Sequence, residues 1–200
     1  YQRYADAVAV RRRYPGIQAI GAAQFVDGSA RAVFSQRAAA DLAGAGQGYP
    51  AFRIRPSGTG VALPITYVDP VGGNEAAVGF DFLSEPRRRT AALAARDLGV
   101  PRLTAPTTLV QETGTQHGAL VMVPVYRTTT TPATAAARRE AFTGVVYAAF
   151  RLGDLAEGAL GVDADRLRLD DVGSTSAPAT TPDPLYAPRA LDDADETELS

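Results

Sequence analysis

The chain has 200 residues, of which 46% are apolar, and its 20 basic and 22 acidic side chains leave a formal net charge of -2. A chain of this length buries roughly 70% of its unfolded surface, so it can hold a full hydrophobic core. The acidic balance provides no basic field for a polyanion and argues against a nucleic-acid partner. The longest apolar runs fall far short of the roughly 18 residues that span a bilayer.

The inventory of side chains excludes several kinds of chemistry. Cysteine is absent, all 20 basic residues are arginine, and histidine occurs once, at His117. Disulfides, thiolate catalysis, the common zinc sites and the lysines of Schiff-base and P-loop enzymes are therefore excluded. A single histidine supplies neither a metal cluster nor, without a nucleophile beside it, general-base chemistry. We accordingly expect no metal, no cofactor and no catalytic residue.

Residues 1–13 have the pattern of a helix with one buried seam. Tyr1, Tyr4, Ala5 and Val8 recur at helical spacing, and three arginines follow, where cations suit the helix dipole. An apolar stripe with charged flanks is typical of a helix that packs on its own lobe or against a partner. Because the chain starts without methionine or a leader, we expect it to be a segment of a longer protein.

The next part of the chain is expected to form strands and one helix. Apolar runs bounded by glycine and proline turns predict strands at residues 17–26, 51–55 and 61–68. Ser29 is expected to cap a helix after the first of these strands. The apolar face of that helix comprises Val33, Phe34, Ala38 and Leu42.

The loop DPVGGNEAAVGFD, residues 69–81, holds several polar side chains. Its glycines allow the backbone to approach a ligand closely. Asp69 precedes a proline, so it is either a residue that starts a turn or the polar anchor of a ligand. Asn74 and Glu75 are expected to cap or brace the loop, and Asp81 to hold the loop or the start of the next helix.

That next helix is predicted to open at Ser84 and Pro86 and to close at Gly99. Its own arginines, residues 87–89, and those at residues 11–13 are expected on solvated helix faces. The alternative for each arginine run is that its side chains pair with a partner.

A pair of strands is predicted at residues 103–111 and 119–126, joined by a polar turn in which His117 is expected to be exposed. Pro124 interrupts the second strand and indicates a bulge or a sheet edge. Another apolar strand is predicted at residues 142–150. The main sheet is therefore expected from the segments near Ile17, Phe52, Ile65, Leu109 and Val121.

The threonine-rich stretch at residues 128–134 is the best internal boundary. Beyond it, strands and helices are mixed without regular alternation, which favours an α+β class with antiparallel sheets over a doubly wound fold. A second, smaller lobe should contain the strand at residues 142–150 or begin just after it. Weaker signals follow: a helix at 154–159, a strand at 167–171, a linker at 174–184 and an acidic run at 192–198.

Separate blocks of the sequence resemble the CHASE domain, an extracytoplasmic sensory domain of membrane receptors such as histidine kinases and cyclases. They are YPGIQAIG at residues 14–21, GNEAAVGFDFLSEPRRRTAALAARDLG at 73–99, and LTAPTTLVQE at 103–112, continued by PVYR at 124–127. Their order and spacing match the family over about residues 14–150. The recurrence of separated blocks makes the resemblance specific.

The resemblance implies an α+β fold in which an N-terminal stalk helix is followed by two PAS-like lobes with antiparallel sheets. It also implies a parent protein anchored in the membrane by flanking transmembrane helices, with a homodimer formed through the stalk helix. The implied parts are the end of the stalk at residues 1–13, a membrane-distal ligand-binding lobe at 14–141, a membrane-proximal lobe at 142–191 and an acidic tail at 192–200.

The same resemblance points to a binding site in the distal lobe. Plant members of the family bind cytokinins, which are N6-substituted adenines, through an aspartate, a leucine and a threonine that correspond to Asp69, Leu93 and Thr104. We expect the pocket to be completed by Leu120, Met122 and Val123, although core packing is the ordinary role of such residues. Replacing the anchor, in Asp69→Ala, should cost about 1.5–3 kcal/mol, or roughly ten- to a hundredfold in affinity.

The functional hypothesis is a sensory domain outside the cytoplasmic membrane that binds a small, adenine-like molecule and signals to an output domain. It is not expected to be an enzyme itself. One alternative is a structural or dimerising module without a small ligand. Another is a hydrolase that uses Asp69, Glu75 and Asp81 as paired carboxylates. An apolar, ligand-sized pocket behind Asp69 would favour sensing, whereas a filled core there would favour the dimerising module.

Overall fold

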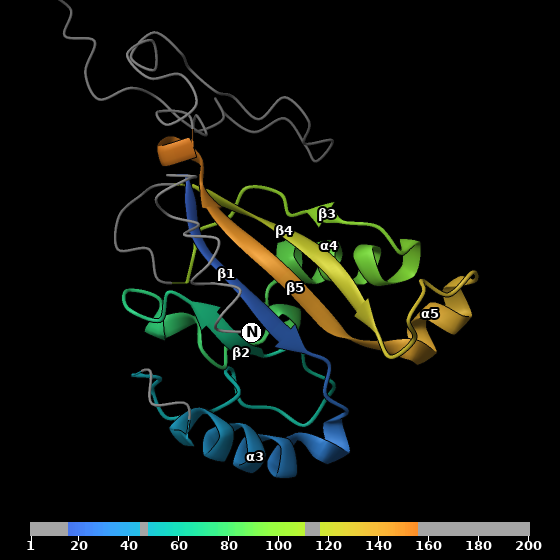
Figure 1. Ribbon diagram of the computed structural model, residues 1–200, viewed down its shortest axis with the longest axis horizontal. Coiled ribbons are helices and arrows are strands. Elements are labelled where there is room, and N and C mark those ends of the chain that lie inside the picture. The colour runs from blue at the N-terminus through green and yellow to red at the C-terminus, as the bar shows by residue number, and fades with distance from the viewer. Residues whose placement is uncertain (1–15, 45–47, 111–116, 156–200) are drawn as a thin grey trace, which may run out of the picture.

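A computed structural model describes residues 16–44, 48–110 and 117–155 (Figure 1). They form a five-stranded antiparallel sheet in the order β2-β1-β5-β4-β3, which confirms the α+β class. The strands are β1 (Ile17–Gln24), β2 (Ile65–Asp69), β3 (Arg102–Leu103), β4 (Gly118–Tyr126) and β5 (Phe142–Arg151). The labelled helices are α3 (Arg31–Gly44), α4 (Pro86–Leu98) and α5 (Ala135–Ala141), with 3-10 turns η1 (Gly28–Ala30), η2 (Glu75–Ala77) and η3 (Phe82–Ser84). Residues 152–155, at the end of the described range, are helical too and overlap the start of the helix predicted at 154–159. The predictions for residues 1–13 and 156–200 lie outside the described residues.

The predicted strands are correct in part. The segments near Ile17, Ile65 and Val121 belong to the sheet, as expected. The segment near Phe52 does not, and that part of the prediction was wrong. The strand predicted at 103–111 is confirmed only at its start, where Leu103 of β3 pairs with Val121, and Leu109 lies beyond it. The side chains of Phe52 and Leu109 are buried, at 4% and 3% exposed, but they reach the core from extended loops without joining a strand ladder. Burial alone therefore made these loops resemble strands.

β5 occupies the centre of the sheet, between β1 and β4. Ala148 pairs with Ile20 on one side and with Val121 on the other. Of the two positions considered for a second lobe, this pairing favours the one that begins after the strand, because residues 142–151 complete the first sheet. The rest of the expected lobe, residues 156–191, lies outside the described residues.

The end of β4 that carries Pro124 is a sheet edge. β3 pairs with β4 at Val121 and Met122, so within the described ranges no strand lies beside β4 on that side at the proline. A register shift follows between Val125 and Tyr126. Both observations agree with the prediction, since a proline lacks the N–H that a ladder requires. His117, expected to be exposed, is half-buried, and its carbonyl accepts from the Leu152 amide at 3.0 Å.

α4 is capped at both ends. Its first residue is Pro86, and Gly99 ends it with a left-handed backbone (φ 73°), both as predicted. The cap itself is Glu85, whose carboxylate accepts from the amides of Arg87 and Arg88 at 3.1 and 2.9 Å. Ser84, predicted to open the helix, instead donates to the Asp81 carbonyl. The longer glutamate side chain thus satisfies the free amides of the first turn.

Two other helix starts differ from expectation. Asp27, not Ser29, is the cap before α3: its carboxylate accepts from the amide and the hydroxyl of Ser29, at 3.0 and 2.7 Å. α5 was not predicted, because the threonine-rich stretch before it was interpreted only as a boundary. Its last member, Thr134, caps the helix by accepting from the Ala137 amide at 3.2 Å.

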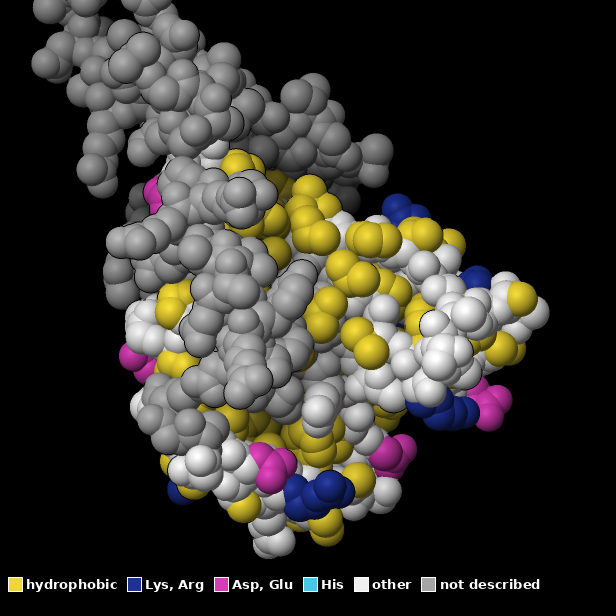
Figure 2. Space-filling view, in the orientation of Figure 1, with side chains coloured by type: hydrophobic (Ala, Val, Ile, Leu, Met, Phe, Trp, Pro, Cys, Tyr) yellow, Lys and Arg dark blue, Asp and Glu magenta, His cyan; other side chains and the backbone are white. Residues whose placement is uncertain are grey.

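The two faces of the sheet differ in what covers them. α4 lies behind the sheet in Figure 1 and packs against β4. Because side chains alternate along a strand, Leu120 and Met122 lie buried on the α4 face, while Val123 and Val125 lie on the opposite face and are more than a third exposed. Figure 2 shows apolar side chains gathered over β4 and β5 on that opposite face.

Candidate functional site

Arg88 is buried, although the sequence had placed it on a solvated face. Only 3% of it is exposed, so that part of the prediction was wrong, whereas its neighbour Arg87 is exposed. The buried residues of α4 recur at helical spacing and therefore share one face. That face comprises Arg88, Ala91, Ala92 and Ala95. The small alanines let the helix lie close to the sheet, and the guanidinium is carried inward at the first turn.

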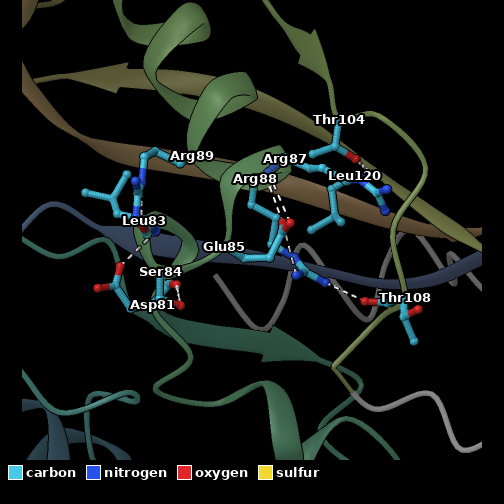
Figure 3. Close-up of polar contacts among 10 residues, drawn as sticks. All are labelled: Asp81, Leu83, Ser84, Glu85, Arg87, Arg88, Arg89, Thr104, Thr108 and Leu120. Carbon is cyan, nitrogen blue, oxygen red and sulfur yellow. Dashed lines mark hydrogen bonds and ion pairs between the residues drawn. The ribbon is translucent and has the colours of Figure 1, made fainter. Parts of the chain in front are cut away.

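The guanidinium of Arg88 has specific partners (Figure 3). Its Nη2 donates to the Thr108 carbonyl at 2.7 Å, and its Nη1 lies 3.4 Å from Glu85 Oε2. The Phe80 ring lies beside it, with its centroid 5.1 Å from Cζ. The Nε atom is buried and has no hydrogen-bond partner among the described residues. Burial lowers the pKa of the Arg88 guanidinium, and the nearby Glu85 charge opposes that shift.

A small cavity adjoins Arg88 between α4, η3 and the sheet. Its volume is about 10 Å³, the room of a single water molecule. Phe82 and Tyr147 form an aromatic wall, with their rings edge to face at a centroid distance of 5.1 Å. The remaining lining side chains are small or aliphatic: Ala19, Ile65, Val68, Ala77, Leu109, Val110, Leu120 and Ala149. The cavity therefore joins an apolar enclosure to one buried cation.

Asp81 fixes the segment that carries this site, as predicted. Its Oδ1 accepts from the amides of Leu63 and Leu83 at 2.7 and 2.9 Å, and the residue is 5% exposed. Arg31 approaches the other carboxylate oxygen at 3.9 Å. Arg89 adds a second tie, donating from Nε to the Leu83 carbonyl at 2.5 Å. Since this carboxylate already holds two backbone amides, it has a structural role.

Three of the predicted site residues lie together on the α4 face. Leu120 lines the cavity. Met122, with 0% exposed, is two residues along β4 and belongs to the core. Thr104 is 3% exposed, and its Oγ1 accepts from the Leu120 amide at 3.0 Å while its own amide donates to the Leu120 carbonyl at 2.9 Å. The threonine hydroxyl therefore extends the pairing of β4.

The other three predicted residues lie elsewhere. Leu93 is only partly buried and stands outside the buried face of α4. Val123 is 37% exposed on the opposite face of the sheet. Asp69 pairs with Ile20, the neighbour of the cavity residue Ala19, so it also lies on the opposite face. The structure does not bring these three side chains to the cavity.

The loop before η2 is braced from inside, as expected for Asn74. This residue is fully buried, and its Nδ2 donates to the Pro70 carbonyl at 2.9 Å. Its Oδ1 accepts from Gln18 Nε2 of β1 at 3.2 Å. The brace ties the loop to the sheet.

Two shallower hollows lie outside this site. One, of about 460 Å³, lies between α3 and the outer side of β1 and β2, and includes Phe34 and Tyr67. The other, of about 410 Å³, runs along α4 beside Leu103. Neither holds a buried charge among the described residues.

Sequence reasoning missed Arg88, although a signal for it was present. The alanines at positions 91, 92 and 95 are three, four and seven residues beyond it, which is the spacing of one helix face. The run of three arginines hid this signal, because such runs are usually solvated.

In the described part of the chain, no group of three or more metal-ligating side chains comes together. Within residues 16–44, 48–110 and 117–155, no helix is both long and apolar enough to cross a membrane.

The family model of the CHASE domain matches residues 1–186 of this 200-residue chain. No curated protein matches it. The match includes all of the sheet, α4 and the site around Arg88, and it agrees with the blocks singled out in the sequence. The chain belongs to the CHASE domain family, the sensory extracellular domains of signalling proteins such as histidine kinases and cyclases.

Proposed function

We propose that the chain is the sensory domain of a membrane-bound receptor of the histidine kinase or cyclase type. It binds a small molecule in the lobe formed by the sheet and α4, and it passes occupancy across the membrane to an output domain. The observation that carries this proposal is the family match over residues 1–186. The domain itself performs no catalysis, and the carboxylate of Asp81, considered for a hydrolase, is engaged by two backbone amides.

The binding site that we propose is the enclosure between the α4 face of the sheet and Phe82. Ligand sites combine an apolar wall with few, well-placed polar groups. Here the wall includes Phe82, Tyr147 and Leu120, and the polar group is Arg88. Because the cavity holds no more than about 10 Å³, a ligand must separate its walls. Binding therefore favours one arrangement of the lobe over another, which is the requirement for signalling.

A structural or dimerising module is the second candidate function. The observation in its favour is the apolar outer face of the sheet, where Val123 and Val125 are 37% and 38% exposed. Such a face suits a protein contact. The proposed homodimer through the stalk helix belongs to residues outside the described part.

Native mass spectrometry of the chain, incubated with a metabolite extract and with adenine derivatives, tests the sensing proposal. We expect a stoichiometric adduct on the wild-type chain. Leu120→Phe, which fills the cavity, should abolish it, whereas Val123→Phe, on the opposite face of the same strand, should leave it unchanged. Thermal unfolding of both variants checks that overpacking, which costs about 1–3 kcal/mol, has not unfolded the lobe.

The outcome can also contradict the proposal. Absence of any adduct on the folded wild-type chain, or an adduct equally strong in both variants, would remove the enclosure as the ligand site. A concentration-dependent dimer broken by Val123→Asp, without any adduct, would favour the structural module.

A further inference from the structure

We infer that the ligand of this enclosure carries a carboxylate, which binds side-on to Nε and Nη2 of Arg88. This inference rests on the proposed function and deepens it by naming a chemical class. It also replaces the neutral adenine expected from the resemblance with an anion.

The first support is the unsatisfied hydrogen bond of Arg88. Buried N–H groups in folded proteins almost always have an acceptor, and an exception at a charged group calls for a missing partner. Arg88 is only 3% exposed and lines the cavity, and its Nε has no hydrogen-bond partner in the described part of the chain. The missing acceptor therefore belongs at the cavity.

The second support is the geometry of the guanidinium. The N–H groups of Nε and Nη2 point in parallel along one side of the plane, and their spacing matches the two oxygens of a carboxylate. Nη2 carries two N–H groups and donates to the Thr108 carbonyl at 2.7 Å, whereas the single N–H of Nε has no acceptor among the described residues. A carboxylate supplies both acceptors at once.

Charge favours the same class. The one anion beside Arg88 among the described residues, Glu85, is 3.4 Å from Nη1 and also accepts from two amides at the start of α4. Its charge is thus shared with the helix terminus, where negative charge is stabilised. The carboxylate of the ligand would bind on the Nε side of the guanidinium, whereas Glu85 lies on the Nη1 side. The remainder of the ligand meets Phe82, Tyr147 and Leu120, which suits a short alkyl chain or a flat ring.

Binding in this mode would be coupled to a change in the chain. The ligand carboxylate binds Nη2 next to the Thr108 carbonyl and displaces that carbonyl where both use the N–H on the Nε side. The next two residues, Leu109 and Val110, form part of the cavity wall. Releasing that carbonyl frees the wall to move outward. Thr107 stays anchored by reciprocal backbone bonds to Gly118, at 2.8 and 2.7 Å. The segment from Thr108 to Val110 would therefore open about a fixed point.

The test uses propionate and benzoate as probes, with propionamide and benzamide as neutral controls of matched shape. Affinities for the folded 200-residue chain are measured by calorimetry. We expect saturable binding of at least one carboxylate and none of its amide. Arg88→Lys keeps the charge but loses the two parallel donors, and should weaken carboxylate binding at least tenfold. Arg87→Lys, the exposed neighbour, should change it less than twofold.

A second measurement covers the case in which Arg88→Lys does not fold. In proton–nitrogen NMR spectra of the wild-type chain, the Arg88 Nε–H resonance, assigned through its own side-chain carbons, should shift saturably with the carboxylate and stay in place with the amide. An unmoved resonance, no binding of either carboxylate, or equal binding by folded Arg88→Lys overturns the inference.

The results distinguish failure of the carboxylate inference from failure of the proposed sensory function. A neutral metabolite that forms an adduct blocked by Leu120→Phe, together with no carboxylate binding, refutes the carboxylate and leaves the sensory function standing. No adduct and no carboxylate binding refute both.

Discussion

α4 and α3 are nearly equal in length, 13 and 14 residues, but they are held in place differently. α4 buries one face, including the Arg88 guanidinium, whereas α3 buries no residue. α3 contacts the rest of the fold through half-buried side chains. The Phe34 ring meets Phe52 edge to face at a centroid distance of 6.0 Å, and Arg31 donates to the Gly60 carbonyl at 3.0 Å.

The difference shows where this fold tolerates change. A helix whose first turn carries a buried charge needs every neighbour in place, because an unpaired charge or amide in the interior is costly. A helix attached by half-buried rings loses only part of its contacts with each substitution. We therefore call the surroundings of Arg88, Asp81 and Phe82 the α4 side, and those of α3, Tyr49 and Tyr67 the α3 side, and expect larger effects on the α4 side.

The largest effect is expected from removing an aromatic ring on the α4 side. Phe82 is 1% exposed and contacts Tyr147 edge to face. Phe82→Ala should lower the free energy of unfolding by about 3–5 kcal/mol, as measured in urea. Phe34→Ala on α3, where the ring is half-buried, should cost about 1–2 kcal/mol because less apolar surface returns to water. Equal losses would contradict the proposed difference between the two sides.

A smaller effect is expected at the two carboxylates that precede the helices. Asp81→Ala leaves the buried amides of Leu63 and Leu83 without their acceptor and should cost about 2–4 kcal/mol in urea unfolding. Asp27→Ala removes an exposed cap before α3 and should cost much less, because water can replace it. If Asp81→Ala unfolded at the same urea concentration as Asp27→Ala, the structural role assigned to Asp81 would be wrong.

A still smaller, pH-dependent effect is expected where α4 meets α5. Hydrogen bonds from Arg139, at 2.7 and 3.0 Å, and from Arg96, at 2.7 Å, hold the pKa of Asp97 well below its ordinary value. A carboxyl with a lowered folded pKa stabilises the fold above its unfolded pKa, about 3.9, and this contribution is lost as pH falls toward the folded pKa.

The stability that Asp97 contributes is therefore expected to depend on pH. Asp97→Asn should cost about 0.5–1 kcal/mol at pH 7, the range of largely exposed ion pairs, and the cost should shrink below about pH 4. Asp41→Asn, an exposed carboxylate on α3, is the control and should change little at either pH. Urea unfolding from pH 2.5 to 7 measures both, and a cost for Asp97→Asn that grows toward acid would reverse the sign argued here.

Alternation and capping signals were sufficient to predict much of the sheet and α4. β1, β4 and β5 have long apolar runs, and Pro86 and Gly99 bound α4, so local patterns determine these elements. The place of β5 at the sheet centre depends on pairing between residues more than 100 positions apart, such as Ala22 with Val146, and no local pattern records that.

The site was less predictable than the fold. Leu120 was predicted because it lies in an apolar strand, whose residues are ordinarily core, but Asp69 and Leu93 were assigned by resemblance, and resemblance does not fix which face a side chain occupies. Arg88 required knowing that its helix face is buried, which depends on packing. The sequence therefore showed the arginine that marks the site, but it did not show that this arginine is buried.

Asp69 is the residue on which sequence and structure now give opposite expectations. It ends β2 opposite Ile20, on the α3 side, where burial chiefly raises the pKa of Tyr49 and the Asp69 charge adds to that shift. The Tyr49 hydroxyl donates to the neighbouring Val68 carbonyl at 2.9 Å, and its ring contacts Tyr67 at 6.4 Å. These contacts give Asp69 surroundings separate from the Arg88 enclosure.

Asp69→Ala should consequently change ligand affinity less than any variant on the α4 side. If Asp69 anchors the ligand, Asp69→Ala should lower the affinity roughly ten- to a hundredfold. Because Asp69 lies on the opposite side of the sheet from the enclosure, we expect the affinity to change less than about twofold. Calorimetry with the metabolite recovered from the extract, or with propionate, decides between them, with Arg88→Lys measured in parallel. A tenfold loss in Asp69→Ala alone would move the binding site to the α3 side, because a carboxylate acts on a ligand through direct hydrogen bonds and not through the intervening sheet.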